Sequence, residues 1–172
     1  MKEYLKGRCP ICKGQLFVNQ FGYQCEDCSF TIPKFICNRN ITIYEAEKIL
    51  QGERIILDGF SKRDGKVFSS IPVVRDSSIS LDNTISQCPQ LGRGRIYVDA
   101  KYFRCSLHGT CSKHCCFANI PGVRRCYNGH LITVEEILRL ILHKVISFKF
   151  RDADGLESEK SISIHGTKMK VV

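Results

Sequence analysis

The 172-residue sequence has no apolar run long enough to cross a membrane. Its longest apolar stretch, residues 134–148, is interrupted by charged side chains, whereas a spanning helix needs about 20 predominantly apolar residues. The first residues, MKEYLKGRCP, also lack the apolar segment of a secretion signal. We therefore expect a cytoplasmic protein with no membrane partner.

Acidic side chains are scarce, most of all in one part of the chain. The 26 Lys and Arg residues outnumber the 17 Asp and Glu residues, which gives a net charge of +9. Between residues 86 and 131 the only acidic residue is Asp99, and the basic residues are Arg93, Arg95, Lys101, Arg104, Lys113, Arg124 and Arg125. Such an excess suits a polyanion such as nucleic acid, although a solvated basic face would have the same composition.

No catalytic constellation can be recognised in the sequence. Phosphate-cradling loops, nucleotide fingerprints and Ser-His-Asp or Cys-His arrangements are not visible, and the five histidines are scattered. We therefore expect a protein that is not an enzyme and has no small-molecule substrate. A nucleic-acid-binding module and a protein-docking module are the two remaining classes.

Cysteine, in contrast, is abundant, with eleven residues. The stretch CPICKGQLFVNQFGYQCEDC contains two Cys-x-x-Cys pairs, Cys9 with Cys12 and Cys25 with Cys28. In a reducing compartment such pairs bind metal or do redox work more often than they form disulfides. Two pairs supply the four thiolates of a tetrahedral structural zinc site. A redox dithiol and an iron–sulfur centre are the alternatives, but a thioredoxin-type pair needs a βαβ unit that this stretch does not resemble.

The same order of features occurs twice along the chain. Each half has a Cys-Pro, a short alternating apolar pattern, further cysteines, a Thr-x-x-Glu helix start and two strand-like runs around a glycine turn. We predict an α+β fold of two tandem small zinc-ribbon-like units, each a short antiparallel sheet with one packing helix and a C-terminal β-hairpin. The first unit is expected at residues 1–75, a linker at 76–87 and a divergent second unit at 88–172.

Several side chains are expected in the cores of these units. Helical spacing predicts that one face of the second helix is buried, through Val134, Ile137, Leu138, Ile141, Leu142 and Val145. We also expect Phe30 to be buried, and Cys37 and Cys126, which precede the two helices, to be core residues.

In the second half the first cysteine pair is broken, because Leu91 takes the place of Cys12. A second zinc site there would use Cys88, Cys105, Cys111 and Cys115. Other donors nearby are His108, His114, Cys116, Cys126 and His130. The alternative is a unit that has lost its metal and buries the remaining cysteines as small apolar residues.

Residues 8–73 closely resemble the zinc-binding repeat at the C-terminus of bacterial type IA DNA topoisomerases, particularly the topoisomerase III-like enzymes. The shared features are Cys-Pro-x-Cys, an aromatic residue before the third Cys, Cys-x-Phe-x-Ile, Ile-Thr at the helix start and a Gly-Phe hairpin with Gly-Lys-x-Phe. Residues 88–164 resemble a divergent second copy. The resemblance implies single-stranded DNA binding by a small sheet, and a chain that lacks the catalytic part of those enzymes.

Aromatic residues interleaved with cations indicate the same role, since every base offers a π-face for stacking. The predicted nucleic-acid-binding residues are Lys13, Phe17, Phe21, Tyr23, Lys34, Lys101, Tyr102, Arg104 and Arg124. Because one face of a small sheet must pack on the helix, some of these rings are expected in the core. Zinc ribbons also dock on polymerases and other machinery, so a docking module for a DNA-processing or transcription machine remains the alternative.

Overall fold

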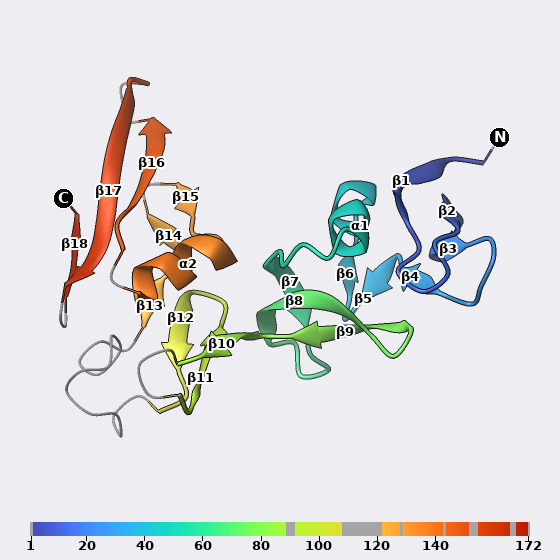
Figure 1. Cartoon of the computed structure of the whole chain (residues 1–172), viewed down its shortest axis with the longest axis horizontal. Coiled ribbons are helices and arrows are strands. Elements are labelled where there is room, and N and C mark those ends of the chain that lie inside the picture. The colour runs from blue at the N-terminus through green and yellow to red at the C-terminus, as the bar shows by residue number, and fades with distance from the viewer. Residues whose placement is uncertain are drawn as a thin grey trace. The chain divides into compact units, whose positions relative to one another are not determined.

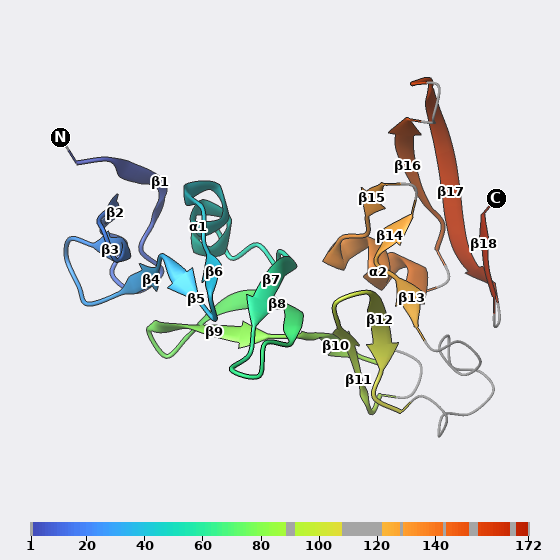
Figure 2. The same cartoon turned by 180° about the vertical axis from the view of Figure 1, so that it is seen from behind.

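The computed structural model describes residues 2–88, 92–107, 122–127, 129–142, 144–151, 155–165 and 168–171. The chain divides into two compact units, Met1–Asp82 (unit 1) and Asn83–Val172 (unit 2) (Figures 1 and 2). Within the described ranges, no helix has the length and apolar character needed to span a membrane.

Unit 1 consists of a four-stranded antiparallel sheet, a small hairpin, one helix and a three-stranded sheet. Its elements are β1 (Tyr4–Arg8), β2 (Gln15–Val18), β3 (Gly22–Cys25), β4 (Thr31–Pro33), β5 (Phe35–Ile36), β6 (Arg39–Asn40), α1 (Ile43–Leu50), β7 (Leu57–Ser61), β8 (Val67–Arg75) and β9 (Ser78–Asp82). Strands follow chain order in both sheets, so neighbouring strands are joined by short connections.

Unit 2 has the same order of elements. They are β10 (Thr84–Gln87), β11 (Arg95–Val98), β12 (Tyr102–Cys105), β13 (Val123–Arg124), β14 (Cys126–Tyr127), β15 (His130–Leu131), α2 (Val134–Ile141), β16 (Ile146–Arg151), β17 (Glu157–His165) and β18 (Lys168–Val171). The sheets are again β10-β11-β12-β13, β14-β15 and β16-β17-β18. The predicted α+β class, with small antiparallel sheets and two helices, is confirmed.

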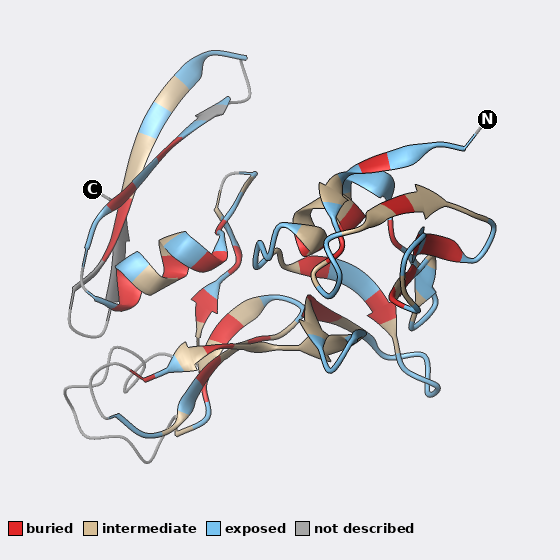
Figure 3. Cartoon of the chain, turned by 45° about the vertical axis from the view of Figure 1, so that its right-hand side comes forward, coloured by how far each residue is buried: buried red, intermediate tan, exposed pale blue. Residues whose placement is uncertain are grey.

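Alternation along the strands gives each four-stranded sheet one buried face. In unit 1 the buried face includes Leu5, Leu16, Tyr23, Cys25 and Ile32, which form one core with Ala46 and Ile49 of α1. Figure 3 shows buried residues recurring along the strands between exposed ones. Because side chains alternate in a strand, the residues between these positions must lie on the opposite face. We call this opposite face the outer face of the sheet.

Both helices begin at the predicted capping boxes. The Thr42 hydroxyl accepts a bond from the Glu45 N–H at 3.3 Å, and the Glu45 carboxylate accepts one from the Thr42 N–H at 2.9 Å. Thr133 and Glu136 form the same pair of bonds in unit 2. Each box satisfies backbone donors that the first turn of a helix leaves unpaired.

The prediction of which side chains form the buried face of the second helix is partly wrong. Val134, Ile137 and Ile141 are buried, as expected, together with Leu140. The helix ends at Ile141, however, so Leu142 is its C-cap and Val145 lies beyond it. The two side chains are 55% and 46% exposed, because helical spacing no longer decides their direction after the last turn.

Residues 76–87, the expected linker, contain two strands. Strand β9 pairs with β8, and β10 pairs with β11. The two strands belong to different units, because the boundary between the units in the sequence falls after Asp82. Within a polar sequence, β9 has apolar residues at the alternate positions Ile79 and Leu81, and β10 has the single apolar residue Ile85.

Cys37 and Cys126 are exposed, so the expectation that both are core residues is wrong. Cys37 occupies the turn of the β5–β6 hairpin with φ of 46°, where its side chain has no core to enter. Cys126 begins β14 and pairs with Leu131, which places it in the position of Phe35 rather than of Cys37. Phe30 is 1% exposed, which confirms its predicted burial.

Candidate metal centre and outer sheet faces

The first cysteine pair lies in the tight turn between β1 and β2. The Cys9 carbonyl accepts a bond from the Lys13 N–H at 3.0 Å, and the Cys9 N–H donates to Gly14 at 2.9 Å. Lys13 adopts φ of 67°. The second pair lies between β3 and β4, where the Cys25 N–H donates to the Phe30 carbonyl at 3.0 Å. Both turns therefore hold their two thiols on a folded backbone loop.

The four thiols converge on one point. The Sγ atoms of Cys9 and Cys28 are 3.6 Å apart, and those of Cys12 and Cys25 are 3.4 Å apart. All four sulfur atoms lie within 4.8 Å of one another. A tetrahedral zinc ion with Zn–S bonds of about 2.3 Å separates its sulfur ligands by about 3.8 Å. The residues present thus fit a four-coordinate zinc site, as the cysteine spacing predicts.

The pKa of one thiol of the cluster is lowered, whereas the pKa values of the other three are raised. Burial opposes ionisation of Cys9, but hydrogen bonds from the backbone N–H groups of Cys12 and Ile11 and from the neighbouring thiols favour its thiolate. The pKa of Cys9 is lowered as a result from 9.0 to about 7. Burial raises the pKa of Cys25. A cation is the partner that stabilises several adjacent thiolates at once.

Gly14 leaves room for a side chain of the second cysteine turn. A Cβ atom at Gly14 would lie 2.1 Å from the Asp27 carboxylate, closer than a real Cβ contact. Asp27 belongs to the second cysteine turn and Gly14 follows the first. A side chain at Gly14 would therefore displace the exposed Asp27 side chain.

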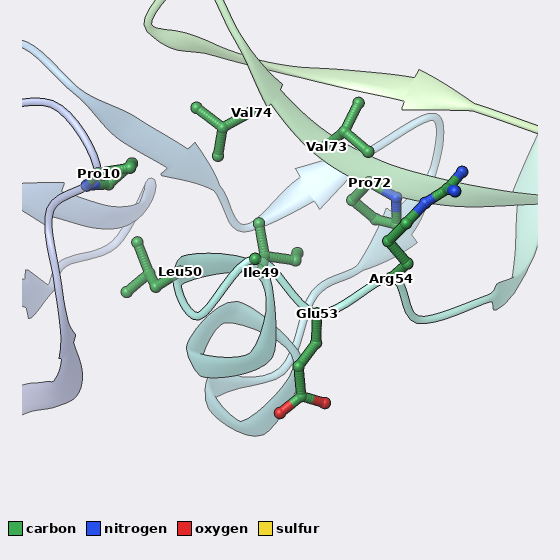
Figure 4. Close-up of a pocket in the computed structure, with 9 residues that line it drawn as sticks. Pro10, Ile49, Leu50, Glu53, Arg54, Pro72, Val73 and Val74 are labelled. Atoms are coloured by element: carbon green, nitrogen blue, oxygen red, sulfur yellow. The ribbon is translucent and has the colours of Figure 1, made fainter. Parts of the chain in front are cut away.

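The first cysteine turn also borders an apolar groove of about 240 Å³ in unit 1. Figure 4 shows Pro10 on one side, Leu50 and Ile49 from the end of α1, and Val73 and Val74 from β8. The remaining lining residues are Gly52, Glu53, Arg54 and Pro72. The first cysteine turn thus lies near α1 and near β8 of the second sheet of the same unit.

The outer face of the first sheet carries aromatic and basic side chains. Tyr4 of β1 lies opposite Phe17 of β2, and Phe17 lies opposite Gln24 of β3. The Lys2 ammonium is 4.4 Å from the centre of the Phe17 ring. Lys6 and Arg8 follow Tyr4 on the exposed side of β1. A ring flanked by cations is a suitable surface for a base and its phosphate.

The outer face of the sheet in unit 2 is richer in these groups. Tyr97 lies opposite Arg104, and Tyr102 lies opposite Arg124. The guanidinium of Arg104 is 4.8 Å from the Tyr102 ring, and that of Arg95 is 5.8 Å from the Tyr97 ring. This part of the sheet therefore alternates tyrosine with arginine both along and across its strands.

An acidic side chain holds part of this surface in place. Asp99, between β11 and β12, is ion-paired with Arg104 and accepts bonds from the N–H groups of Lys101 and Tyr102 at 2.8 and 2.7 Å. Burial disfavours its carboxylate, but these donors outweigh that effect and lower the pKa of Asp99 below 3.8. Asn19 takes the same place in unit 1, where its side chain accepts bonds from the N–H groups of Phe21 and Gly22.

Tyr23 does not belong to the outer face, so its prediction as a nucleic-acid-binding residue is wrong. The side chain is 3% exposed, and its hydroxyl donates to the Ile41 carbonyl at 2.6 Å. Tyr23 is two residues from the metal-site Cys25 and therefore shares its inward face. The residue of unit 2 that corresponds to Tyr23 is Phe103, which is fully buried. Tyr102 precedes Phe103 in the strand and therefore lies on the opposite face of the sheet.

The other predicted nucleic-acid-binding residues remain accessible to different extents. Lys13, Lys101 and Arg124 are exposed, and Phe17, Lys34, Tyr102 and Arg104 are half-buried. Phe21 is 74% exposed, and its carbonyl accepts a bond from the Lys34 N–H at 2.8 Å. The structure thus brings Phe21 and Lys34 together at the end of the first sheet.

Two outer-face residues, Tyr4 and Lys6, were missed in the sequence. Arg8, Arg95 and Tyr97 belong to the same interleaved aromatic and basic pattern but were not among the predicted binding residues. A signal was present, because Tyr4, Lys6 and Arg8 alternate with the buried Leu5 and with Gly7. The same period-2 pattern places Arg95 and Tyr97 on one face of β11, with Ile96 and Val98 buried on the other.

The predicted second metal site is described only in part. Cys88 and Cys105 are both buried, and the Gly92 N–H donates to the Cys88 carbonyl at 3.0 Å, as the Lys13 N–H donates to Cys9 in unit 1. Cys111 and Cys115 lie outside the described residues. Within the described part of the chain, no second group of three or more ligand side chains comes together.

Comparison with known families supports the resemblance seen in the sequence. Residues 27–82 match the family model described as the C-terminal repeat of topoisomerase. Searches of the curated proteins and of the solved structures returned no significant match. The match confirms that unit 1 resembles a topoisomerase C-terminal repeat. Three of the four cysteines precede the matched segment, so the metal centre is supported by its geometry.

Proposed function

We propose that the chain is a non-catalytic, zinc-containing module that binds single-stranded DNA through the outer faces of its two four-stranded sheets. The observation that carries the proposal is the pairing of aromatic and basic side chains on these faces. It is clearest where Tyr97 and Tyr102 lie among Arg95, Arg104 and Arg124. The match of residues 27–82 to a topoisomerase repeat supports a nucleic-acid partner.

Zinc would have a structural role in this module. Four cysteine ligands complete its coordination shell and leave no open position for a substrate or an activated water. Cys9 and Cys12 connect β1 to β2, whereas Cys25 and Cys28 connect β3 to β4. A bound ion would therefore fix both connections and hold the outer face in one shape. The ion would be needed because so small a sheet buries little apolar area by itself.

The chemistry of the faces suits a single strand better than a duplex. Bases of a single strand are free to stack on tyrosine or phenylalanine, while arginine and lysine hold the phosphates. The bases of a duplex already stack on one another, so only its phosphates remain available to the outer faces. Contacts of this kind read no base sequence, and we propose sequence-tolerant binding.

The alternative is a docking module for another protein of a DNA-processing or transcription machine. The apolar groove beside Pro10 favours this second function, because an apolar side chain of a partner could fill it. The excess of basic residues on the sheet faces favours nucleic acid.

A titration of the zinc-loaded protein with labelled oligothymidine and with a duplex of equal length distinguishes the two functions. We expect tighter binding of the single strand and a steep loss of affinity as salt rises. Equal affinity for the single strand and the duplex would indicate a basic surface that attracts phosphates without stacking bases. Absence of binding at low salt would favour the docking module.

A further inference from the structure

The β7–β8 hairpin of unit 1 carries a cluster of cations separate from the outer face of the first sheet. Its turn reads Lys62-Arg63-Asp64-Gly65-Lys66, and all five residues are exposed. Figure 1 shows this turn apart from the strands β1 to β4 of the same unit. Asp64 is the only acidic residue of the turn and lies 3.4 Å from the Lys66 ammonium. Among the described residues, Lys62 and Arg63 have no acidic partner.

The hairpin presents these cations on a rigid support. The Lys62 N–H donates to the Lys66 carbonyl, and the Gly65 N–H donates to the Lys62 carbonyl, both at 3.0 Å. Gly65 has φ of 78°, as the last residue of such a three-residue turn requires. Just below the turn, the Phe60 and Phe68 rings stack at 5.5 Å, and the Lys62 ammonium lies 6.0 Å from the Phe68 ring.

The base of the hairpin is also tied to the β5–β6 turn. The Ser61 N–H donates to the Cys37 carbonyl at 2.8 Å, and the Asn38 amide donates to the Ser61 hydroxyl at 3.0 Å. The Asp58 carboxylate accepts a bond from the Ser69 hydroxyl at 2.5 Å, which links the two strands across the hairpin. The base of the hairpin is therefore held by contacts with the β5–β6 turn and by a bond between its own two strands.

The matching hairpin of unit 2 has the opposite charge. Residues 60–70 contain Lys62, Arg63 and Lys66 against Asp64, three positive charges less one negative, or +2. Residues 150–160 contain Arg151 and Lys160 against Asp152, Asp154, Glu157 and Glu159, two positive charges less four negative, or −2. Each hairpin follows the helix of its unit. The positive charge therefore belongs to the hairpin of unit 1 alone and is not shared by the two units.

We propose that the β7–β8 turn of unit 1 is a second phosphate-binding surface, through which Lys62, Arg63 and Lys66 hold the backbone of the single strand whose bases stack on the sheet. The corresponding residues 150–160 of unit 2, with a net charge of −2, would not bind that backbone. Arginine suits this role because its planar guanidinium binds phosphate oxygens in pairs, and lysine adds a point charge. This inference rests on the proposed function, since it takes the same ligand, but it concerns a different surface.

The test compares three forms of the full chain by titration with oligothymidine at a series of salt concentrations. They are the wild type, the variant K62Q/R63Q/K66Q and the control variant R75Q/K144Q/K149Q. The control loses the same charge from exposed positions outside the proposed surfaces. Each phosphate contact on a single strand contributes about 0.7 to the slope of log K against log salt. The hairpin variant should therefore have a slope smaller by about 2, and the control should keep the wild-type slope.

Equal slopes for the hairpin variant and the wild type would overturn this inference while leaving the proposed function intact. An equal loss of slope in the control would also overturn it, because net charge would then explain the effect. No binding by the wild type would overturn both proposals. The single variant Arg63→Gln, with a slope smaller by about 0.7, gives the answer if the triple variant does not fold.

Discussion

Tyr97 of β11 lies directly opposite Arg104 of β12 on the outer face of the sheet in unit 2. The same pair of positions in unit 1 is occupied by Phe17 and Gln24. An aromatic ring thus recurs at one place of the repeat, whereas the cation beside it differs between the copies. We infer that the ring is the common element of the two outer faces, and that the outer face of unit 2 binds phosphate more strongly at this position than the outer face of unit 1.

The first prediction concerns this ring. Tyr97→Ala should weaken single-strand binding by about 1–3 kcal/mol, the value of one lost base stack, while the salt slope stays nearly the same. The matched control is Tyr23→Phe, which removes only the hydroxyl bond to Ile41. It should lower the free energy of unfolding by about 1 kcal/mol and leave DNA affinity unchanged. Wild-type affinity of the Tyr97 variant would contradict the assignment of the outer face.

The second prediction concerns the metal centre. The reduced protein should contain zinc bound through Cys9, Cys12, Cys25 and Cys28, and Cys25→Ser should abolish that binding. Because metal binding and folding are coupled in small zinc domains, unit 1 should lose its structure while unit 2 retains it.

Metal analysis and an NMR spectrum of each variant check this expectation. Cys37→Ser is the matched control, since Cys37 is exposed and outside the cluster. It should keep both the zinc content and the spectrum of the wild type. Unchanged chemical shifts throughout residues 8–73 of the Cys25→Ser protein would show that the site is not needed for the fold of unit 1.

Asp99 supplies a pH-dependent prediction. Its pKa is lowered in the folded state, despite burial, by Arg104 and by two backbone N–H donors. A carboxylate with a lowered pKa stabilises the fold above its unfolded pKa, and this contribution is lost as pH falls through the folded value. Asp99→Asn should therefore be less stable than the wild type at neutral pH, and the difference should shrink below pH 3.8.

Thermal unfolding of both proteins across this pH range is the measurement. Asparagine preserves the two backbone bonds, as Asn19 does in unit 1, and removes the charge together with the bond that Arg104 donates to the second carboxylate oxygen. Any acid loss of zinc affects both proteins and cancels in their difference. A difference that stays constant with pH would show that the charge of Asp99 contributes nothing to stability.

Local signals predicted the parts of the fold that depend on neighbours in sequence. Thr42 with Glu45, and the glycines of the two long hairpins, act within a few residues and were identified correctly. The four-cysteine cluster was also predictable, because the spacing of each pair nearly determines its geometry.

Features that depend on strand register were harder to predict. Tyr23 looked like a stacking residue, but its pairing with Ile32 and its shared face with Cys25 direct it inward. Cys126 looked equivalent to Cys37 until the pairing of β14 with β15 placed it elsewhere. Strand β9 was missed because its pairing partner β8, rather than its polar sequence, defines it.

Photo-crosslinking tests the central claim, that single-stranded DNA lies on the outer faces of the two sheets, most directly. The zinc-loaded protein would be irradiated with oligonucleotides containing 5-iodouracil, and the attached residues identified by mass spectrometry. We predict crosslinks at Phe17, Tyr97 and Tyr102, and none at the buried Tyr23. Crosslinks confined to residues outside the outer faces, or efficient crosslinking at Tyr23, would contradict the account.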